Sequence, residues 1–303
     1  MSRRARQWLA VVVAVVAAAT TTFPTGPARA DSPAETHGPR ALALGDSARA
    51  AATGASAISL NPAGLSLSRA YVVEGSYGLR PADDMTVASL SVCDSTRRYA
   101  ACVHYGHLAA SPDAGDRELS EWGSTVSMPL SERLLIGTTG RYVNYAPSGG
   151  AGGAGETREK AIIVDVGLVA RLGSRFDAAV VGHNVVGGDD DQFPRAVGAG
   201  LALQALPNLQ VTADGLFRLA GAADGTARYG GGAELFVAQT AEQRGFPLRI
   251  GYAHDRASGA SYLSGGVGYV DARFALDASL RRQVVDGDEL TMLVGLRIFM
   301  PPR

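Results

Sequence analysis

The chain has 303 residues, a formal net charge of −1 and 38 glycines, and 19% of its residues are charged. Without the four arginines of the first thirty residues the formal charge is near −5, which argues against nucleic acid as a partner. The mean hydropathy is only +0.06, and no later segment is long and apolar enough for a spanning helix, so a helical membrane protein is excluded.

The first thirty residues have the pattern of a cleaved export signal. Three arginines at positions 3, 4 and 6 precede a short apolar run over residues 8–19, and Ala28-Arg29-Ala30 provides an A-x-A cleavage site. The run is shorter than the roughly 20 residues that a spanning helix needs. We therefore expect a signal peptide over residues 1–30, cleaved after Ala30, with an uncleaved N-terminal anchor as the alternative.

Residues 31–69 are rich in small side chains and have no alternating pattern. The stretch Asp46–Ile58 predicts a short helix, with Asp46 or Ser47 as its N-cap. Asn61-Pro62-Ala63-Gly64-Leu65 predicts a tight turn, because asparagine can bond its own backbone two residues on and proline presets φ. By residue chemistry alone this turn leads into the first strand, and the segment before it is either a packed element or a flexible linker.

Residues 70–300 are a succession of strand-like segments separated by turn signals. Fourteen are predicted: Tyr71–Leu79, Met85–Cys93, Tyr99–Ala109, Leu119–Met128, Arg133–Tyr145, Lys160–Leu172, Arg175–Val186, Arg195–Ala205, Leu209–Leu219, Ala227–Ala238, Pro247–His254, Ser261–Val270, Ala272–Val284 and Glu289–Met300. Residues 301–303 follow as a short tail.

Alternation within these segments indicates one apolar and one polar wall. In Ala272–Val284, Phe274 and Leu276 share one face with Leu280, and Asp277 and Arg281 share the other. Connections after even-numbered segments are mostly short, whereas those after odd-numbered segments tend to be longer. This favours a transmembrane antiparallel barrel of about 14 strands over a soluble β-sandwich, with both termini on the periplasmic side.

The polar wall predicts a set of charges that face the lumen, because a charge facing lipid costs roughly 2–4 kcal/mol at the membrane midplane for Arg. The candidates are Glu74, Arg141, Asp165, Asp214, Arg218, Arg228, Glu234, Arg249, Asp277 and Arg281. Pairing across strands that fills the barrel is one interpretation of these residues, and a path for substrate is the other.

Cys93 and Cys102 flank a turn between two predicted strands. Hairpin pairing centred on Arg97 and Arg98 places the two thiols opposite each other, and export permits oxidation. We therefore predict a disulfide, although a register slip of one residue would separate the two cysteines.

An enzyme is not expected. The five histidines are scattered, and His104 and His107 would lie on opposite faces of a strand, so no metal site is predicted. Nucleophile, phosphate-binding and zinc motifs are missing from the sequence, and no cofactor is predicted.

The stretch Arg40–Ala50, followed by the Asn61–Leu65 motif, resembles the N-terminus of the FadL-like outer-membrane family, and especially its PorV/PorQ-like branch. The segments Phe193-Pro194-Arg195, Pro247–Tyr252 and Gly265–Tyr269 add to this likeness. The resemblance implies a fourteen-stranded barrel with an N-terminal plug, or hatch, in its lumen. Unlike typical outer-membrane chains, this one does not stop at a terminal aromatic residue.

For function, the FadL-like resemblance implies a porin-like barrel in the outer membrane of a Gram-negative-type bacterium that takes up fatty-acid-like hydrophobic small molecules. The PorV/PorQ-like branch implies instead a scaffold or shuttle for exported proteins, and a purely structural barrel is the third alternative. Outer-membrane lipid and the outer-membrane assembly machinery are the other expected partners. Glycine-rich Tyr229–Ala233 and Gly265–Gly268 are candidate sites for an opening in the wall.

Overall fold

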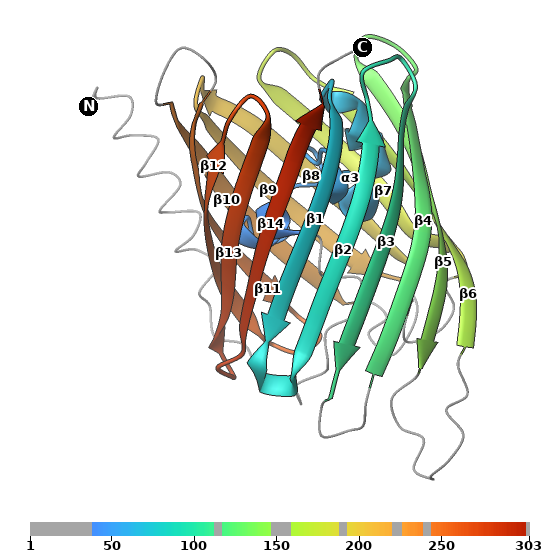
Figure 1. The fold of residues 1–303 in the computed structure, drawn as a ribbon, viewed down its shortest axis with the longest axis vertical. Helices are drawn as coiled ribbons and strands as arrows, with labels where there is room; N and C mark the ends of the chain where they lie inside the picture. Colours follow the sequence, from blue (N-terminus) through green and yellow to red (C-terminus); the bar gives the residue numbers. More distant parts are fainter. Residues whose placement is uncertain are drawn as a thin grey trace.

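The computed structural model describes residues 38–111, 117–146, 159–187, 193–219, 226–238 and 244–300. Fourteen antiparallel strands pair in chain order over these ranges, and β14 pairs with β1, so the sheet closes into a barrel (Figure 1). This confirms the predicted fold class. The expected signal peptide over residues 1–30 and the tail over residues 301–303 lie outside the described residues.

Each predicted strand segment overlaps one observed strand. The strands are β1 (Tyr71–Arg80), β2 (Met85–Asp94), β3 (Ala100–Ala110), β4 (Arg117–Pro129), β5 (Leu134–Ala146), β6 (Glu159–Arg171), β7 (Phe176–Val186), β8 (Ala196–Leu206), β9 (Leu209–Arg218), β10 (Ala227–Ala238), β11 (Gly245–Asp255), β12 (Ser261–Val270), β13 (Phe274–Val285) and β14 (Leu290–Met300).

The barrel has two distinct ends. At the turn end, uppermost in Figure 1, β1 begins, β14 ends, and short turns such as residues 207–208 connect the strands. At the loop end, β1 joins β2 through the 3-10 helix η3 (Pro81–Asp83), and the other odd-numbered strands join their successors.

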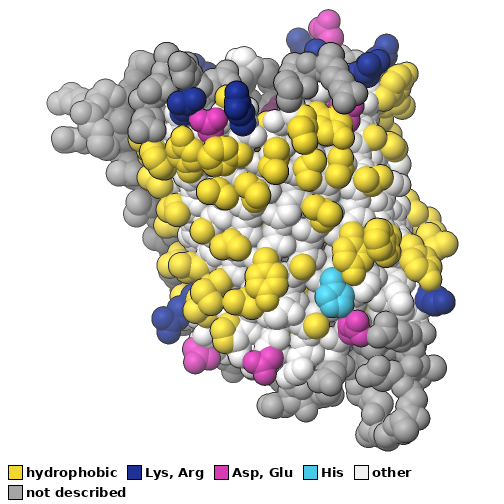
Figure 2. Space-filling view, in the orientation of Figure 1, with side chains coloured by type: hydrophobic (Ala, Val, Ile, Leu, Met, Phe, Trp, Pro, Cys, Tyr) yellow, Lys and Arg dark blue, Asp and Glu magenta, His cyan; other side chains and the backbone are white. Residues whose placement is uncertain are grey.

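The outer wall is apolar between the two ends. Along β13, the outward-facing Leu276 and Leu280 are 48% and 50% exposed, whereas the inward-facing Ala275 and Arg281 are buried. Figure 2 shows hydrophobic side chains over the middle of the wall and charged side chains gathered near both ends. This is the surface of a barrel that spans a bilayer, with its polar side chains turned inward. No helix in the described ranges is long and apolar enough to cross a membrane.

Residues 38–69 lie inside the barrel and form the plug. It consists of α2 (Pro39–Ala43), α3 (Ala55–Leu60) and the 3-10 helix η2 (Pro62–Leu67), which contact opposite parts of the wall (Figure 1). The helix α2 contacts β11–β14, and η2 contacts β3–β6.

The predicted single helix over Asp46–Ile58 is wrong. Gly45, Asp46 and Gly54 all have positive φ angles, a conformation that interrupts a right-handed helix, so the chain turns between α2 and α3. The Asp46 carboxylate also does not cap a helix, because it binds an arginine of the wall instead.

Candidate functional site

The plug lies directly on the backbone of the inner wall. Among the described residues, nine wall glycines face it so closely that an added Cβ would come within 3.0 Å of a plug atom. They are Gly137, Gly167, Gly198, Gly200, Gly230, Gly232, Gly251, Gly266 and Gly295. Glycine lets the two backbones approach to a distance that any side chain would prevent. Part of the high glycine content of the sequence therefore allows close packing between the plug and the wall.

The Asn61–Leu65 turn is the contact between the plug and the β5–β6 side of the wall. The Asn61 side chain is fully buried; its Oδ1 accepts a hydrogen bond from Ala63 N at 3.1 Å. Its Nδ2 donates to Arg49 O at 3.1 Å and to Leu168 O of β6 at 3.2 Å. One amide thus closes the turn and joins it to both the plug and the barrel.

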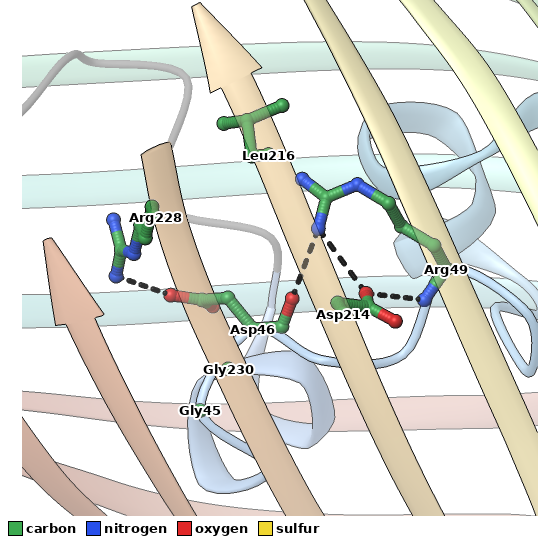
Figure 3. Close-up of a pocket in the computed structure, with 7 residues that line it drawn as sticks. All are labelled: Gly45, Asp46, Arg49, Asp214, Leu216, Arg228 and Gly230. Carbon is green, nitrogen blue, oxygen red and sulfur yellow. Dashed lines mark hydrogen bonds and ion pairs between the residues drawn. The ribbon is translucent and has the colours of Figure 1, made fainter. Parts of the chain in front are cut away.

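On the opposite side of the lumen, ion pairs hold the plug (Figure 3). The Arg49 guanidinium lies 3.1 Å from the Asp214 carboxylate of β9, and Arg49 N also donates to that carboxylate at 2.9 Å. Asp46 pairs with Arg228 of β10 at 2.9 Å and with Arg281 of β13 at 3.4 Å. These buried pairs fix the turn between α2 and α3 against three strands.

A small cavity of about 30 Å³ separates the plug from β9 and β10 at these pairs. Asp46, Arg49, Asp214 and Arg228 line it, and Figure 3 shows their side chains converging on it. A polar cavity of this size has room for about one or two water molecules. Water in this cavity would contact the groups that bind the plug, and it could take their place as a hydrogen-bond partner when the plug shifts.

A second set of ion pairs extends from the plug around the wall. The Arg40 guanidinium lies 3.0 Å from Glu234, which also binds Arg249 at 2.5 Å. Arg249 and Arg297 both bind Asp277, at 2.5 and 2.7 Å. Five alternating charges thus connect α2 to β10, β11, β13 and β14.

An apolar cluster, here called the mouth cluster, lines the inner wall near the loop end of β2–β6. It consists of Met85, Val87, Leu108, Ala110, Leu119, Val143, Tyr145, Ile163 and Phe193, with Ala161 packed against it. The rings of Tyr145 and Phe193 meet edge to face at 5.2 Å between centroids. The inner wall is therefore apolar at the loop end of these strands and polar further in.

A polar layer lies between the mouth cluster and the plug. Arg141 of β5 binds Asp165 of β6 at 2.8 Å, and Asp165 also accepts a hydrogen bond from Asn184 N at 2.7 Å. In this part of the wall, His104 is buried and its Nε2 lies 3.7 Å from Glu121.

The ladder between β6 and β7 is interrupted in this layer. Val164 pairs with Val186 but Val166 pairs with Gly182, so the bulge His183–Val185 lies opposite Asp165 alone. Asn184 has a φ of 54°, and its side chain donates to Pro194 O at 2.8 Å. Side chains, rather than ladder hydrogen bonds, hold the wall together here.

All ten lumen-facing candidates lie on the inner wall, in four groups. Glu74, Asp214, Arg228, Glu234 and Arg281 bind the plug; Arg249 and Asp277 extend the chain of charges from Glu234; Arg141 and Asp165 form the polar layer, while Arg218 pairs with Asp255. The candidates are thus partners of the plug and of one another.

Other predicted features are also placed. Cys93 and Cys102 are directly opposite on β2 and β3, are joined by a disulfide, and pack in one apolar cluster with plug residues such as Leu60. The glycine-rich stretch Tyr229–Ala233 keeps continuous pairing to both neighbouring strands, whereas in Gly265–Gly268 the pairing to β11 stops before Gly268. Three of the glycines in these stretches, Gly230, Gly232 and Gly266, contact the plug closely.

Sequence reasoning missed the plug's own charges, Arg40, Asp46 and Arg49. They lie in the Arg40–Ala50 stretch that carries the family resemblance, so the signal was present, but which wall residue each one contacts depends on the fold.

The mouth cluster was also missed. Its signal is apolar residues on both faces, as at Ile162 and Ile163, which are 66% and 0% exposed.

Together, the closed fourteen-stranded wall, the apolar belt and the inserted N-terminal plug define the class of the protein as a plugged transmembrane β-barrel. The solved structures that align with this chain include channels and transporters for hydrocarbons. The monoaromatic hydrocarbon channel CymD aligns with a TM-score of 0.67 at 14% identity, covering 88% of this chain and 98% of CymD.

Two further structures align over similar lengths. The toluene transporter TbuX of Ralstonia pickettii aligns with a TM-score of 0.64 at 12% identity, covering 87% of this chain and 98% of that one. A FadL homologue of Pseudomonas aeruginosa aligns with a TM-score of 0.62 at 10% identity, covering 86% and 97%. The chain thus has the fold of FadL-type channels, while the PorV/PorQ-like branch stays a prediction. No family model and no curated protein matches the sequence.

Proposed function

We propose that this protein is a channel of the outer membrane that admits hydrophobic small molecules, with the plug as its movable hatch. The observation that carries the proposal is the mouth cluster, a buried apolar cluster at the loop end of a barrel that is closed further in by polar residues and by the plug, which ion pairs hold against the wall. An apolar lining offers a hydrophobic compound a favourable environment where it leaves water. The fold shared with channels for monoaromatic hydrocarbons supports the same function.

Passage requires the plug to move. Its contacts with the wall include apolar packing of residues such as Leu60, and also hydrogen bonds and ion pairs, several of which border the water-sized cavity beside Arg49 and Asp214. Replacing such a contact with water costs about 1.5–3 kcal/mol for each hydrogen bond to a charged group. Ligand binding shifts the hatch only if the ligand binds the displaced state more tightly by at least the free energy of the contacts that are lost.

A disulfide between plug and wall tests this movement. The hydroxyl oxygens of Ser47 in the plug and Thr212 in β9 are 2.9 Å apart, so Ser47→Cys/Thr212→Cys places two thiols within reach of each other. The double variant is expressed in host cells that lack their own channel, and uptake of labelled long-chain fatty acid and labelled toluene is measured. We expect the oxidised variant to lose uptake and a mild reductant to restore it.

The matched control puts a disulfide in the wall without touching the plug. Ser76 of β1 and Ser89 of β2 face each other with their hydroxyl oxygens 2.7 Å apart, and Ser76→Cys/Ser89→Cys should leave uptake unchanged under both conditions. Full uptake by the oxidised plug variant would disprove hatch movement. A wild-type barrel that folds but carries neither compound would favour the scaffold or shuttle alternative.

A further inference from the structure

The outer wall carries a groove of about 990 Å³ over β11–β14, β1 and β2. Leu248, Val267 and Leu276 line it with apolar side chains, while Gly75 and Ala278 contribute little or no side chain. Figure 2 shows areas of backbone and other side chains, drawn in white, between the hydrophobic side chains on this face of the barrel. The groove faces the membrane, where the smaller side chains leave the wall hollow.

The groove reaches the turn end at a cluster of aromatic rings. Phe246 and Tyr269 both line it, with their ring centroids 5.4 Å apart, and Phe274 lies 5.8 Å from Tyr269. Aromatic rings at this depth lie at the boundary between hydrocarbon and headgroups in a transmembrane barrel. One end of the groove is therefore at headgroup level and the other is in the hydrocarbon core.

Positive charge lies beside this aromatic end. Arg273 immediately precedes Phe274 and is exposed. Arg244 is 46% exposed and binds Asp271 at 2.7 Å, and Asp271 also accepts a hydrogen bond from Arg273 N at 3.2 Å. Two guanidinium groups and one carboxylate leave a net charge of +1 next to the groove, complementary to a phosphate.

We propose that this groove binds one phospholipid of the surrounding membrane, with an acyl chain along Leu248, Val267 and Leu276 and the phosphate beside Arg273. An acyl chain in the groove gains packing contacts on several sides that a chain on a convex wall does not have. The charge–phosphate contact fixes the orientation of the lipid, so that it exchanges more slowly than its neighbours. The site is on the outer wall and does not depend on what passes through the lumen.

Native mass spectrometry of the protein released from micelles that contain dioleoyl phosphatidylglycerol tests the proposal. We expect one retained lipid per wild-type barrel. Ala278→Phe fills the groove and should lower lipid occupancy at least tenfold, and Arg273→Gln should lower it severalfold. Ala213→Phe, which adds the same ring to the outer face of β9, should retain the wild-type occupancy.

Both phenylalanine variants point toward lipid, and heat-modifiable mobility checks that each has folded. Glycerol phosphate distinguishes a lipid from a free phosphate, because it lacks the acyl chain and should not displace the lipid. The proposal is overturned if Ala278→Phe keeps its lipid, or if glycerol phosphate competes with it. It is also overturned if the species that the wild type retains and Ala278→Phe does not has the mass of a second copy of the chain.

Discussion

Asn61 shows how much of the plug depends on single residues. Its amide makes three hydrogen bonds, and the wall glycine beneath it, Gly167, would place an added Cβ 2.0 Å from Asn61 Oδ1. Each partner is a backbone group that a folded chain must keep paired, and a buried unpaired group costs about 1–3 kcal/mol. The Asn61–Leu65 motif is therefore a docking element as well as a turn.

We expect Asn61→Ala to loosen the plug by about 1–3 kcal/mol, because it leaves Arg49 O, Leu168 O and Ala63 N without this partner. Limited proteolysis of the folded protein should then cleave residues 38–69 faster, while the barrel keeps its heat-modifiable mobility. Asn61→Asp is the matched control for the turn, since it keeps the acceptor for Ala63 N but loses both donated hydrogen bonds. Unchanged protection of the plug in Asn61→Ala would contradict this role.

At the scale of elements, the β2–β3 hairpin illustrates how a strand pair also supports the plug. Cys93 and Cys102 are directly paired in register and nearly fully buried, and their disulfide lies in the apolar cluster that contains Leu60. The two strands are neighbours in sequence, so the cross-link closes only a short loop, with a sequence separation of nine residues.

Reduction of this disulfide should destabilise the barrel by about 2–3 kcal/mol, the loop-entropy value for a loop of this length. The measurement is urea unfolding in detergent micelles, followed by mobility with and without heating. Cys93→Ala/Cys102→Ala should show the same loss plus a small cavity effect, and it should not respond to reductant. Equal midpoints for the oxidised and reduced wild-type protein would refute the prediction.

At the scale of the whole molecule, polar and apolar side chains are distributed in the reverse of the way they are in a soluble domain. Apolar side chains cover the outer wall, and the ion pairs and hydrogen bonds that hold the plug lie within. The free-energy cost of a charge that faces lipid increases with its depth in the bilayer, so the outer wall should tolerate charged side chains only near its ends.

This depth dependence can be measured within one strand. Leu201 lies in the middle of β8 and Leu206 at its turn end, and they are 47% and 38% exposed. We expect Leu201→Arg to destabilise folding into lipid vesicles by roughly 2–4 kcal/mol and Leu206→Arg by about 0–1 kcal/mol. Equal effects at the two positions would mean that the wall does not sit in the membrane as proposed.

The strands were predictable because turn signals separate them and several carry a clear alternation, as in β6 and β13. Ile163 lies inward and Ile162 outward as period two requires, and the turns are marked by their residues. The facing of Asp165, Asp277 and Arg281 could be read in the same way. The turn between α2 and α3 could not be predicted in this way, because the positive φ angle of Asp46 is stabilised by Arg228, a residue 182 positions away.

The sequence by itself determined the number and order of the strands, the face on which each charge lies, and the opposition of Cys93 and Cys102, because these follow from local periodicity and from pairing between neighbouring strands. Only the tertiary structure decided which charges meet. Closure of the barrel brings Arg40 to Glu234 and Arg49 to Asp214. It also places the wall glycines where the plug can pack closely against them. Such contacts join residues far apart in the chain, and no local pattern encodes the partner of a buried charge.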